Sequence, residues 1–398
     1  MPPSRRPRRL STIWIILAVL LVWDGLSWLI IGALLSPVLP GGWMLIVLAA
    51  FFLLAPFAIL ARSFSGAGYP SAFTRIFLFR PFWYAQLLLP LLAGAGLAGA
   101  LFGLAFGGAG RDGRFVISVV AILLLVLLVW GYSGTRRLVV RRLDAAFPDL
   151  PPELDGLTIA QLSDLHIGPQ TSRRYLARVA AAVRDANPEL IALTGDQVDD
   201  YARDVEPFAA ALSAISAPLG VFAIAGNHDI IAGWHAVREG LERFGITVLV
   251  NHAVPLERGG ARFWVAGIGD PAGRGWQRGG GLAAAPDLDR TLAGVPPTEF
   301  TLALAHNPAL WPGLAERGVA LKLSGHTHYG QLAIPRLGWS LASSFLEFAM
   351  GAYERHGSLL YINPGTNFWG IPFRLGTPPE VTLLTLRRAS PPGISPTQ

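Results

Sequence analysis

Four long apolar runs in the first 132 residues constrain the fold more than any other feature of the sequence. They lie at about residues 10–35, 43–61, 82–106 and 115–132. Each is long enough to cross about 30 Å of hydrocarbon as an α-helix that rises ~1.5 Å per residue. The first run is longer than the core of a secretory signal and is followed by further apolar runs, so we interpret it as a retained helix. The sequence therefore predicts a basic tail at residues 1–9 and a transmembrane region at 10–133 with about four helices.

The charge of the chain is divided unequally. Residues 1–142 hold thirteen Arg and two Asp, a formal charge of +11, which leaves −5 for the rest of a chain whose total is +6. Most of these Arg residues lie at the N-terminus, between the second and third runs and after the fourth run. The positive-inside rule places those sides in the cytoplasm, so the C-terminal part is expected there too; an odd number of spans would reverse this.

Composition also excludes several classes of function. The acidic C-terminal part gives no electrostatic indication of nucleic-acid binding. The chain has no Cys, which rules out disulfides and thiolate metal sites.

Two features of the apolar region have more than one interpretation. Asp24 lies near the middle of the first run, where a carboxylate is costly unless it is paired, protonated or hydrated. We expect a local hydroxyl partner, and a proton or ion pathway is the alternative. Gly99, Gly103 and Gly107 repeat every four residues, a spacing that lets helices approach closely. We interpret this repeat as a helix-packing surface.

The pattern changes after residue 133. A stretch at 134–156 that begins with basic residues and ends with several prolines predicts a linker. From residue 157 apolar strand-like runs alternate with helical patterns, which is typical of an α/β domain with its site at the strand ends. Later strand-like runs have fewer helices between them and predict a second sheet packed on the first. The domain is expected at residues 157–388, followed by a disordered tail at 389–398.

Five polar motifs follow directly after apolar strand-like runs. They are SDLHIG at 163–168, GDQVDD at 195–200, GNHD at 226–229, AHNP at 305–308 and SGHTHYGQ at 324–331. An α/β fold collects its strand ends along one edge, so motifs more than a hundred residues apart in sequence converge there. Their imidazoles, carboxylates and one amide suit divalent ions such as manganese, iron or zinc. The sequence therefore predicts a metal centre at this edge.

The five motifs, in this order and spacing, resemble those of the calcineurin-like metallophosphoesterases, and the chain resembles their membrane-associated bacterial branch. The resemblance covers about residues 157–386. It implies a four-layer α/β/β/α sandwich of two mixed sheets and a location at a bacterial inner membrane. It further implies two divalent metal ions at the strand ends, of which manganese is the first choice. It also implies hydrolysis of a phosphodiester or phosphomonoester by a hydroxide shared between the two ions.

The resemblance assigns roles to the residues of the motifs. Seven metal ligands are implied: Asp164, His166 and His328 for the first ion, Asn227, His306 and His326 for the second, and Asp196 as the bridge. His228 is the expected catalytic residue, which contacts the phosphoryl group or protonates the leaving oxygen. Asp229 is expected to orient His228 or to cap a turn. We interpret Asp199 and Asp200 as loop caps outside the site.

Other residues are candidates for substrate binding. The branch usually has Gly-Gly after the second His of the last motif, whereas here Tyr329 precedes Gly330, and its phenol is expected to narrow the pocket or to bind a phosphoryl oxygen. Arg274 and Arg278 lie in a Gly-rich loop that either contacts an anionic substrate or lipid headgroups, or is a plain solvated loop. The remaining motif-free histidines are interpreted as surface or packing residues: His235, His252 and His356.

These observations predict a membrane-tethered phosphoesterase whose partners are membrane lipids and a phosphorylated small molecule or lipid-linked substrate. The alternative is a transport or sensor protein that uses a degenerate phosphoesterase-like domain for ligand binding. The presence of every motif ligand counts against degeneracy.

Overall fold

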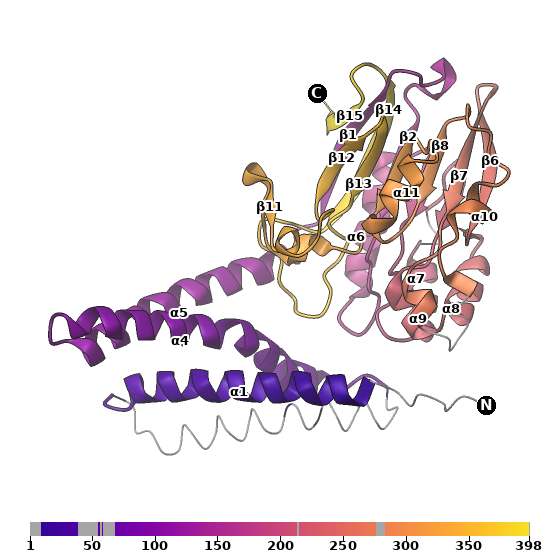
Figure 1. The fold of residues 1–398 in the computed structure, drawn as a ribbon. Coiled ribbons are helices and arrows are strands. Elements are labelled where there is room, and N and C mark those ends of the chain that lie inside the picture. The colour runs from indigo at the N-terminus through magenta and orange to yellow at the C-terminus, as the bar shows by residue number, and fades with distance from the viewer. Residues whose placement is uncertain are drawn as a thin grey trace, which may run out of the picture. The chain divides into compact units, whose positions relative to one another are not determined.

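The computed structural model describes residues 9–38, 55, 58, 68–212, 215–275 and 283–397 (Figure 1). The chain forms two compact units, residues 1–129 and 130–398, and each is described by itself.

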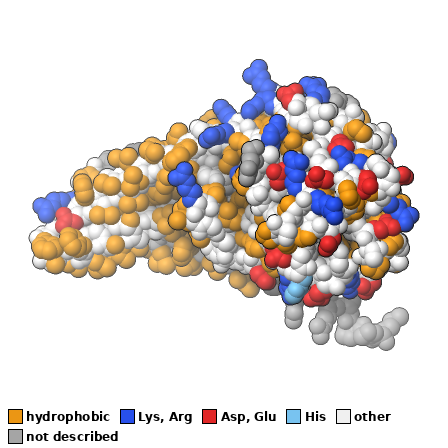
Figure 2. All heavy atoms as spheres, turned by 90° about the horizontal axis from the view of Figure 1, so that it is seen from above, with side chains coloured by type: hydrophobic (Ala, Val, Ile, Leu, Met, Phe, Trp, Pro, Cys, Tyr) orange, Lys and Arg blue, Asp and Glu red, His pale blue; other side chains and the backbone are white. Residues whose placement is uncertain are grey.

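The N-terminal unit holds long apolar helices. They are α1 (Arg9–Leu35), α4 (Arg80–Leu104) and α5 (Ala109–Gly134). The last turn of α5 belongs to the second unit. A short helix α3 (Ala72–Thr74) and a π-helical turn (Arg75–Phe79) lead into α4. In the described part of the chain, three helices are long and apolar enough to cross a membrane. Figure 2 shows hydrophobic side chains covering their surface. The predicted run at 43–61 lies almost wholly outside the described residues.

Close approach of α4 and α5 explains part of the glycine pattern. A Cβ added at Gly96 would lie 2.4 Å from Ile117, and one at Gly99 would lie 2.7 Å from Val116. A Cβ added at Gly103 would lie 2.9 Å from Ala109 Cα, whereas Gly107, beyond the end of α4, has nothing within 4 Å. Arg111 and Arg114 lie within the first turns of α5, which therefore begins before the predicted run at 115–132.

The partner of Asp24 differs from the expected hydroxyl. Gln86 Nε2 of α4 donates a hydrogen bond to Asp24 Oδ2 of α1 (2.9 Å). An amide thus stabilises the buried carboxylate, because it supplies a donor without adding a second charge.

The second unit contains two mixed sheets. The first has the strand order β15-β1-β14-β2-β3-β4-β5, in which β2 to β5 are parallel and β14 is antiparallel to β2. Its strands are β1 (Val139–Phe147), β2 (Thr158–Leu162), β3 (Leu190–Leu193), β4 (Val221–Ala223), β5 (Thr247–Val248), β14 (Glu380–Arg388) and β15 (Gly393–Pro396). In register, Ile159 of β2 lies opposite Leu190 of β3, which brings the ends of both strands to the same edge.

The second sheet has the order β12-β13-β9-β8-β7-β6, with a parallel centre (β13, β9, β8, β7) and two antiparallel edge strands. Its strands are β6 (His252–Arg258), β7 (Ala261–Gly267), β8 (Thr301–Leu304), β9 (Leu321–Ser324), β12 (Gly351–Arg355) and β13 (Ser358–Ile362). A separate two-stranded hairpin is formed by β10 (Ala333–Ile334) and β11 (Trp339–Ser340).

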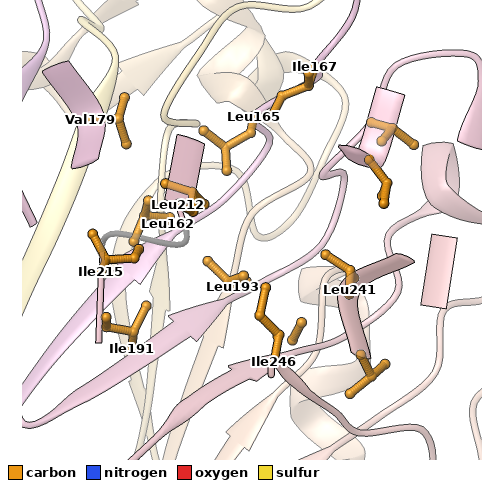
Figure 3. Packing of buried hydrophobic residues seen from close by; sticks show 14 of the residues in the cluster. Leu162, Leu165, Ile167, Val179, Ile191, Leu193, Leu212, Ile215, Leu241 and Ile246 are labelled. Atoms are coloured by element: carbon orange, nitrogen blue, oxygen red, sulfur yellow. The ribbon is translucent and has the colours of Figure 1, made fainter. Parts of the chain in front are cut away.

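Hydrophobic clusters define four layers. One cluster packs helices α6 (Arg173–Ala186), α7 (Val205–Leu212) and α8 (Asn227–Glu242) on the outer face of the first sheet (Figure 3). A second cluster fills the space between the two sheets, and a third packs the short helices α10 (Leu288–Leu292) and α11 (Trp311–Ala315) on the second sheet. Central strands are therefore buried on both faces, as in β3, where all four residues are buried.

Two strands form in segments that were predicted to lie outside the α/β domain. β1 lies in the predicted linker at 134–156, and β15 lies in the predicted tail at 389–398, where it pairs with β1. The charged side chains of β1 interrupt its apolar pattern, because Arg141 and Arg142 are exposed while Leu143 and Ala145 are buried.

Candidate metal centre

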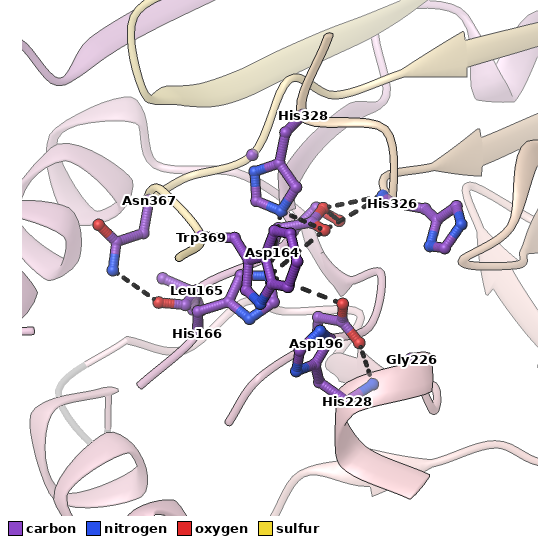
Figure 4. A network of polar contacts seen from close by, with 12 residues as sticks. Asp164, Leu165, His166, Asp196, Gly226, His228, His326, His328, Asn367 and Trp369 are labelled. Carbon is purple, nitrogen blue, oxygen red and sulfur yellow. Dashed lines mark hydrogen bonds and ion pairs between the residues drawn. The ribbon is translucent and has the colours of Figure 1, made fainter. Parts of the chain in front are cut away.

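All seven predicted ligands lie just beyond the ends of parallel strands in the two sheets. Figure 4 shows five of them: Asp164, His166, Asp196, His326 and His328. The first sheet supplies Asp164 and His166 after β2, Asp196 after β3 and Asn227 after β4. The second sheet supplies His306 after β8 and the pair His326 and His328 after β9. Residues 164 positions apart in sequence are thus brought to one edge of the sandwich.

One group of side chains surrounds Asp164. His328 Nε2 lies 3.2 Å from Asp164 Oδ1 and 3.0 Å from His166 Nε2. These three residues offer ligand atoms within 4.8 Å of one another and are buried, so they could hold one metal ion.

A second group contains Asp196 and shares Asp164 with the first. His306 Nε2 lies 3.2 Å from Asp196 Oδ2 and 4.0 Å from Asp164 Oδ1. His166 Nε2 lies 3.6 Å from the same Asp196 oxygen, so this carboxylate faces both groups. His326 lies beside His306 and its Nδ1 is 2.9 Å from Asn227 Oδ1.

The protonation of His306 tests whether these residues fit a cation. Its Nδ1 lies 2.8 Å from the carbonyl oxygen of Thr194, which can only accept, so Nδ1 carries the proton of the neutral ring. The lone pair of Nε2 then faces the Asp196 carboxylate in a fully buried position, and Nε2 has no hydrogen bond. Two facing lone pairs require a positive charge between them, which a metal ion or a proton supplies. The donor set fits a divalent cation.

The electrostatics of the side chains agree with this interpretation. Burial lowers the pKa of His306, but Asp196 and Asp164 raise it by more, and the result lies well above the ordinary value. Burial lowers the pKa of His328 to about 4, despite the opposing effect of Asp164, so this ring is neutral near pH 7. A neutral imidazole is the form that binds metal ions.

Comparison with known proteins identifies this part of the chain. Residues 157–330 match the model of the calcineurin-like phosphoesterase family. They form a calcineurin-like phosphoesterase domain. A transmembrane protein with metallophosphoesterase domain from Danio rerio is 32% identical over 292 residues, which cover 70% of this chain and 64% of that protein. An uncharacterized metallophosphoesterase from Helicobacter pylori is 30% identical over 257 residues, or 64% of this chain and 65% of that protein. The chain therefore spans less than two thirds of either relative.

Among solved structures, a sulfate thiohydrolase from Thermus thermophilus resembles this chain with a TM-score of 0.38 and 15% identity, over 60% of this chain and 58% of that one.

The backbone of the phosphoesterase domain is unusual at its candidate ligands. Five of them have positive φ values: Asp164, His166, Asp196, His326 and His328. This conformation is uncommon for residues other than glycine and costs about 1–3 kcal/mol at each position. Hydrogen bonds between the loops hold it, including Asp164 N to Gly195 O (3.0 Å) and His166 N to Asp196 O (3.0 Å). Such strain concentrates at functional sites.

His228, the predicted catalytic residue, lies at the start of α8 beside the two groups. Its Nδ1 donates to the carbonyl oxygen of Asp199 (2.9 Å), which leaves Nε2 as the nitrogen that can contact a substrate. Its ring lies 4.7 Å from that of His166 and 5.5 Å from that of Trp369. The Asp199 carboxylate, expected outside the site, lies 3.6 Å from His166 Nδ1.

Asp229 caps a turn and does not orient His228. Its two oxygens accept from the backbone N–H groups of Gly226 (2.9 Å) and Val198 (3.1 Å). The capping alternative is therefore correct. Burial and the nearby charge of Asp196 raise the pKa of Asp229 to about 7.

Arg374 supports the His328 loop, a role that the sequence did not suggest. The fully buried guanidinium donates to the carbonyl oxygens of Pro364 (2.6 Å), His328 (3.1 Å) and Asn367, and its Nη2 lies 3.1 Å from His328 Nδ1. These contacts fix the position and plane of the His328 ring.

Of the three predicted substrate contacts, the structure describes Tyr329 and Arg274, and the polar groups of both have partners other than the candidate ligands. The phenol of Tyr329 is buried away from the centre, because it donates to Ile362 O (2.6 Å) and accepts from Gly351 N (2.8 Å). Its expected role in the pocket is therefore wrong. Arg274 is exposed and donates to Pro286 O (3.4 Å), and Arg278 lies outside the described residues. His235, His252 and His356 are exposed, as predicted.

The Tyr329→Phe variant is expected to lower the free energy of unfolding by about 1–3 kcal/mol, because it leaves buried polar groups at Ile362 and Gly351 without their partner. Thermal unfolding in detergent measures the loss, and metal content should not change. An unchanged melting temperature, or loss of metal, would contradict a purely structural role.

Proposed function

We propose that this chain is a membrane-anchored, metal-dependent phosphoesterase that hydrolyses a phosphoric ester on a lipid-linked substrate. The observation that carries the proposal is the buried His306 Nε2, which faces the Asp196 carboxylate at 3.2 Å without a hydrogen bond, a pair of donor atoms that suits a divalent cation. Family membership of residues 157–330 supports hydrolysis as the reaction class.

Two groups of residues would hold divalent cations, with manganese as our first choice. Asp164, His166 and His328 would bind one ion, Asn227, His306 and His326 the other, and Asp196 both. When bound, such a pair supplies Lewis-acid stabilisation of phosphoryl charge and activates water for attack on phosphorus.

We assign to His228 the transfer of a proton to the leaving group. Burial lowers its pKa, but Asp196 and the carbonyl of Asp199 raise it by more, so the net pKa lies above the ordinary value. A larger share of the ring is then protonated near neutral pH, which suits donation from Nε2 to a departing oxygen.

The His228→Ala variant is expected to lower the hydrolysis of bis-p-nitrophenyl phosphate by at least about 10²-fold at unchanged metal content, because the general acid is lost. The full chain, loaded with manganese in detergent, is assayed across pH. His235→Ala, which removes an exposed histidine from the same helix, is the matched control. Equal rates for the two variants would remove His228 from the mechanism.

We further propose that the protein lies in a bacterial inner membrane with the phosphoesterase domain in the cytoplasm. The apolar helices and the relatives named as transmembrane proteins support membrane location, and the distribution of Arg supports the orientation. A Glu257→Cys variant in intact cells should be protected from a membrane-impermeant maleimide and react only after lysis. Labelling before lysis would reverse the orientation.

A further inference from the structure

The segment at residues 332–346, here called the apolar hairpin, exposes an unusual group of large side chains. It contains β10 and β11, and six of its apolar residues are exposed: Ile334, Leu337, Trp339, Leu341, Phe345 and Leu346. Leu337 and Phe345 keep 75% and 81% of their surface exposed. The segment has one charged residue, Arg336. A soluble surface rarely groups so many large apolar side chains without a partner.

The apolar hairpin is an ordered element. Ala333 and Ile334 pair with Ser340 and Trp339 across the two strands. Beyond β11 the chain turns through reciprocal hydrogen bonds between Ser340 and Ser343, including Ser343 Oγ to Ser340 O (2.6 Å). The exposed side chains are therefore presented on a defined backbone, as a binding surface requires.

Two backbone contacts connect this hairpin to the end of α5 within the same unit. Ala333 N donates to Leu375 O (2.9 Å), and the adjacent Arg374 N donates to Gly131 O (2.8 Å) in the last turn of α5. A Cβ added at Gly131 would lie 2.2 Å from the Phe373 ring, so glycine permits this close contact. Two backbone hydrogen bonds, through the adjacent residues Arg374 and Leu375, thus link β10 to the last turn of α5.

The end of α5 marks the level of a membrane interface. Trp130 and Tyr132 are exposed there, and Arg136 and Arg137 follow them on the surface. Amphipathic aromatic rings and basic residues of this kind flank transmembrane helices at the level of the lipid headgroups. Because the apolar hairpin is tied to Gly131, it lies close to that level, and Arg336 can pair with lipid phosphates.

The hairpin also adjoins the metal centre. It follows Gln331, the last residue of the SGHTHYGQ motif. The side chain of Gln331 donates a hydrogen bond to the carbonyl oxygen of Trp369 (3.0 Å). The Trp369 ring in turn lies 5.5 Å from the His228 ring, so Gln331 and Trp369 connect the start of the hairpin to the centre.

We propose that the apolar hairpin inserts into the headgroup region of the bilayer beside the exit of α5 and holds the metal centre next to the lipid surface. Continuity with a membrane-spanning helix selects lipid as the occupant of this surface. Insertion itself does not depend on the proposed hydrolytic function and is testable without substrate.

Because the chain has no cysteine, a single label can be introduced cleanly. The full-length Phe345→Cys variant, labelled with the fluorophore NBD, is reconstituted in vesicles of phosphatidylcholine and phosphatidylglycerol. We expect blue-shifted emission and loss of most of the intensity when phosphatidylcholine carrying a doxyl quencher is added. Glu257→Cys is the matched control, because it lies on the edge strand β6 at the opposite side of the unit (Figure 1). NBD at this position should emit at the wavelength typical of an aqueous environment, and doxyl lipid should not quench it.

A Leu337→Cys variant repeats the test at the hairpin tip and excludes an effect peculiar to position 345. Emission at both positions equal to that at Glu257, without quenching, would overturn the proposal. Blue-shifted emission that resists doxyl lipid and grows with the protein-to-lipid ratio would also overturn it, in favour of contact between copies of the chain.

Discussion

The Asp196→Asn variant is expected to retain fewer than two metal ions per chain and to lose hydrolytic activity by at least ~10³-fold, equivalent to about 4 kcal/mol of transition-state stabilisation. The amide has the size of the carboxylate and still accepts from His228 N, which donates to Asp196 Oδ1 at 2.8 Å. It lacks the negative charge that faces His306 and His166. The loss should therefore come from the site and not from the fold.

Metal analysis of the purified protein and hydrolysis of p-nitrophenyl phosphate and its bis ester check this result. Asp289→Asn is a suitable control, because Asp289 is an exposed carboxylate paired with Arg317. Two bound ions and a rate equal to that of the control would refute the assignment of Asp196 as a shared ligand.

The Arg374→Met variant is expected to lose about 3–5 kcal/mol of folding free energy, because a buried hydrogen-bonded cation is removed and three carbonyl oxygens lose their donor. We also expect metal affinity to fall by about 10–100-fold, because Arg374 contacts Nδ1 of His328, the ring nitrogen that does not face Asp164, and so orients this candidate ligand. Arg374→Lys should recover only part of both losses, because an ammonium cannot reproduce the planar fork of donors.

Thermal unfolding in detergent and metal titration measure the two effects separately. Arg317→Met, which removes a surface ion pair with Asp289, should cost less than about 1 kcal/mol. If Arg374→Met melts with this control and binds metal as the native chain does, Arg374 does not support the centre.

The convergence of the candidate ligands could be predicted from the sequence because each motif directly follows an apolar run. Leu190–Leu193 is buried on both faces, so its pattern is unbroken and the position of Asp196 beyond the strand end could be inferred. The same reasoning failed for β1, whose exposed Arg141 and Arg142 resemble the basic flank of a transmembrane helix. Its strand is stabilised by partners such as Glu380, 239 positions away, which pairs with Arg141 (2.5 Å).

Side-chain direction was less predictable than position. Tyr329 is adjacent to a ligand in sequence, but its positive φ of 54° and bonds to Ile362 and Gly351 turn the phenol toward the second sheet. Arg374 reaches the centre only through tertiary contacts, and no local pattern distinguishes it from a surface residue. Asp199 lies in the GDQVDD motif, but only the tertiary structure shows that its carboxylate lies 3.6 Å from His166 Nδ1.

The two sheets each contribute one side of the candidate centre, which has a consequence for folding. Asp164 extends from the first sheet and His328 from the second, and their side chains meet at 3.2 Å. An ion coordinated by both would act as a clasp across the sandwich, absent from the unfolded chain. Metal binding would then raise the free energy of unfolding with the logarithm of the free-metal concentration. The stability of the folded domain would therefore depend on how much metal its cellular compartment contains.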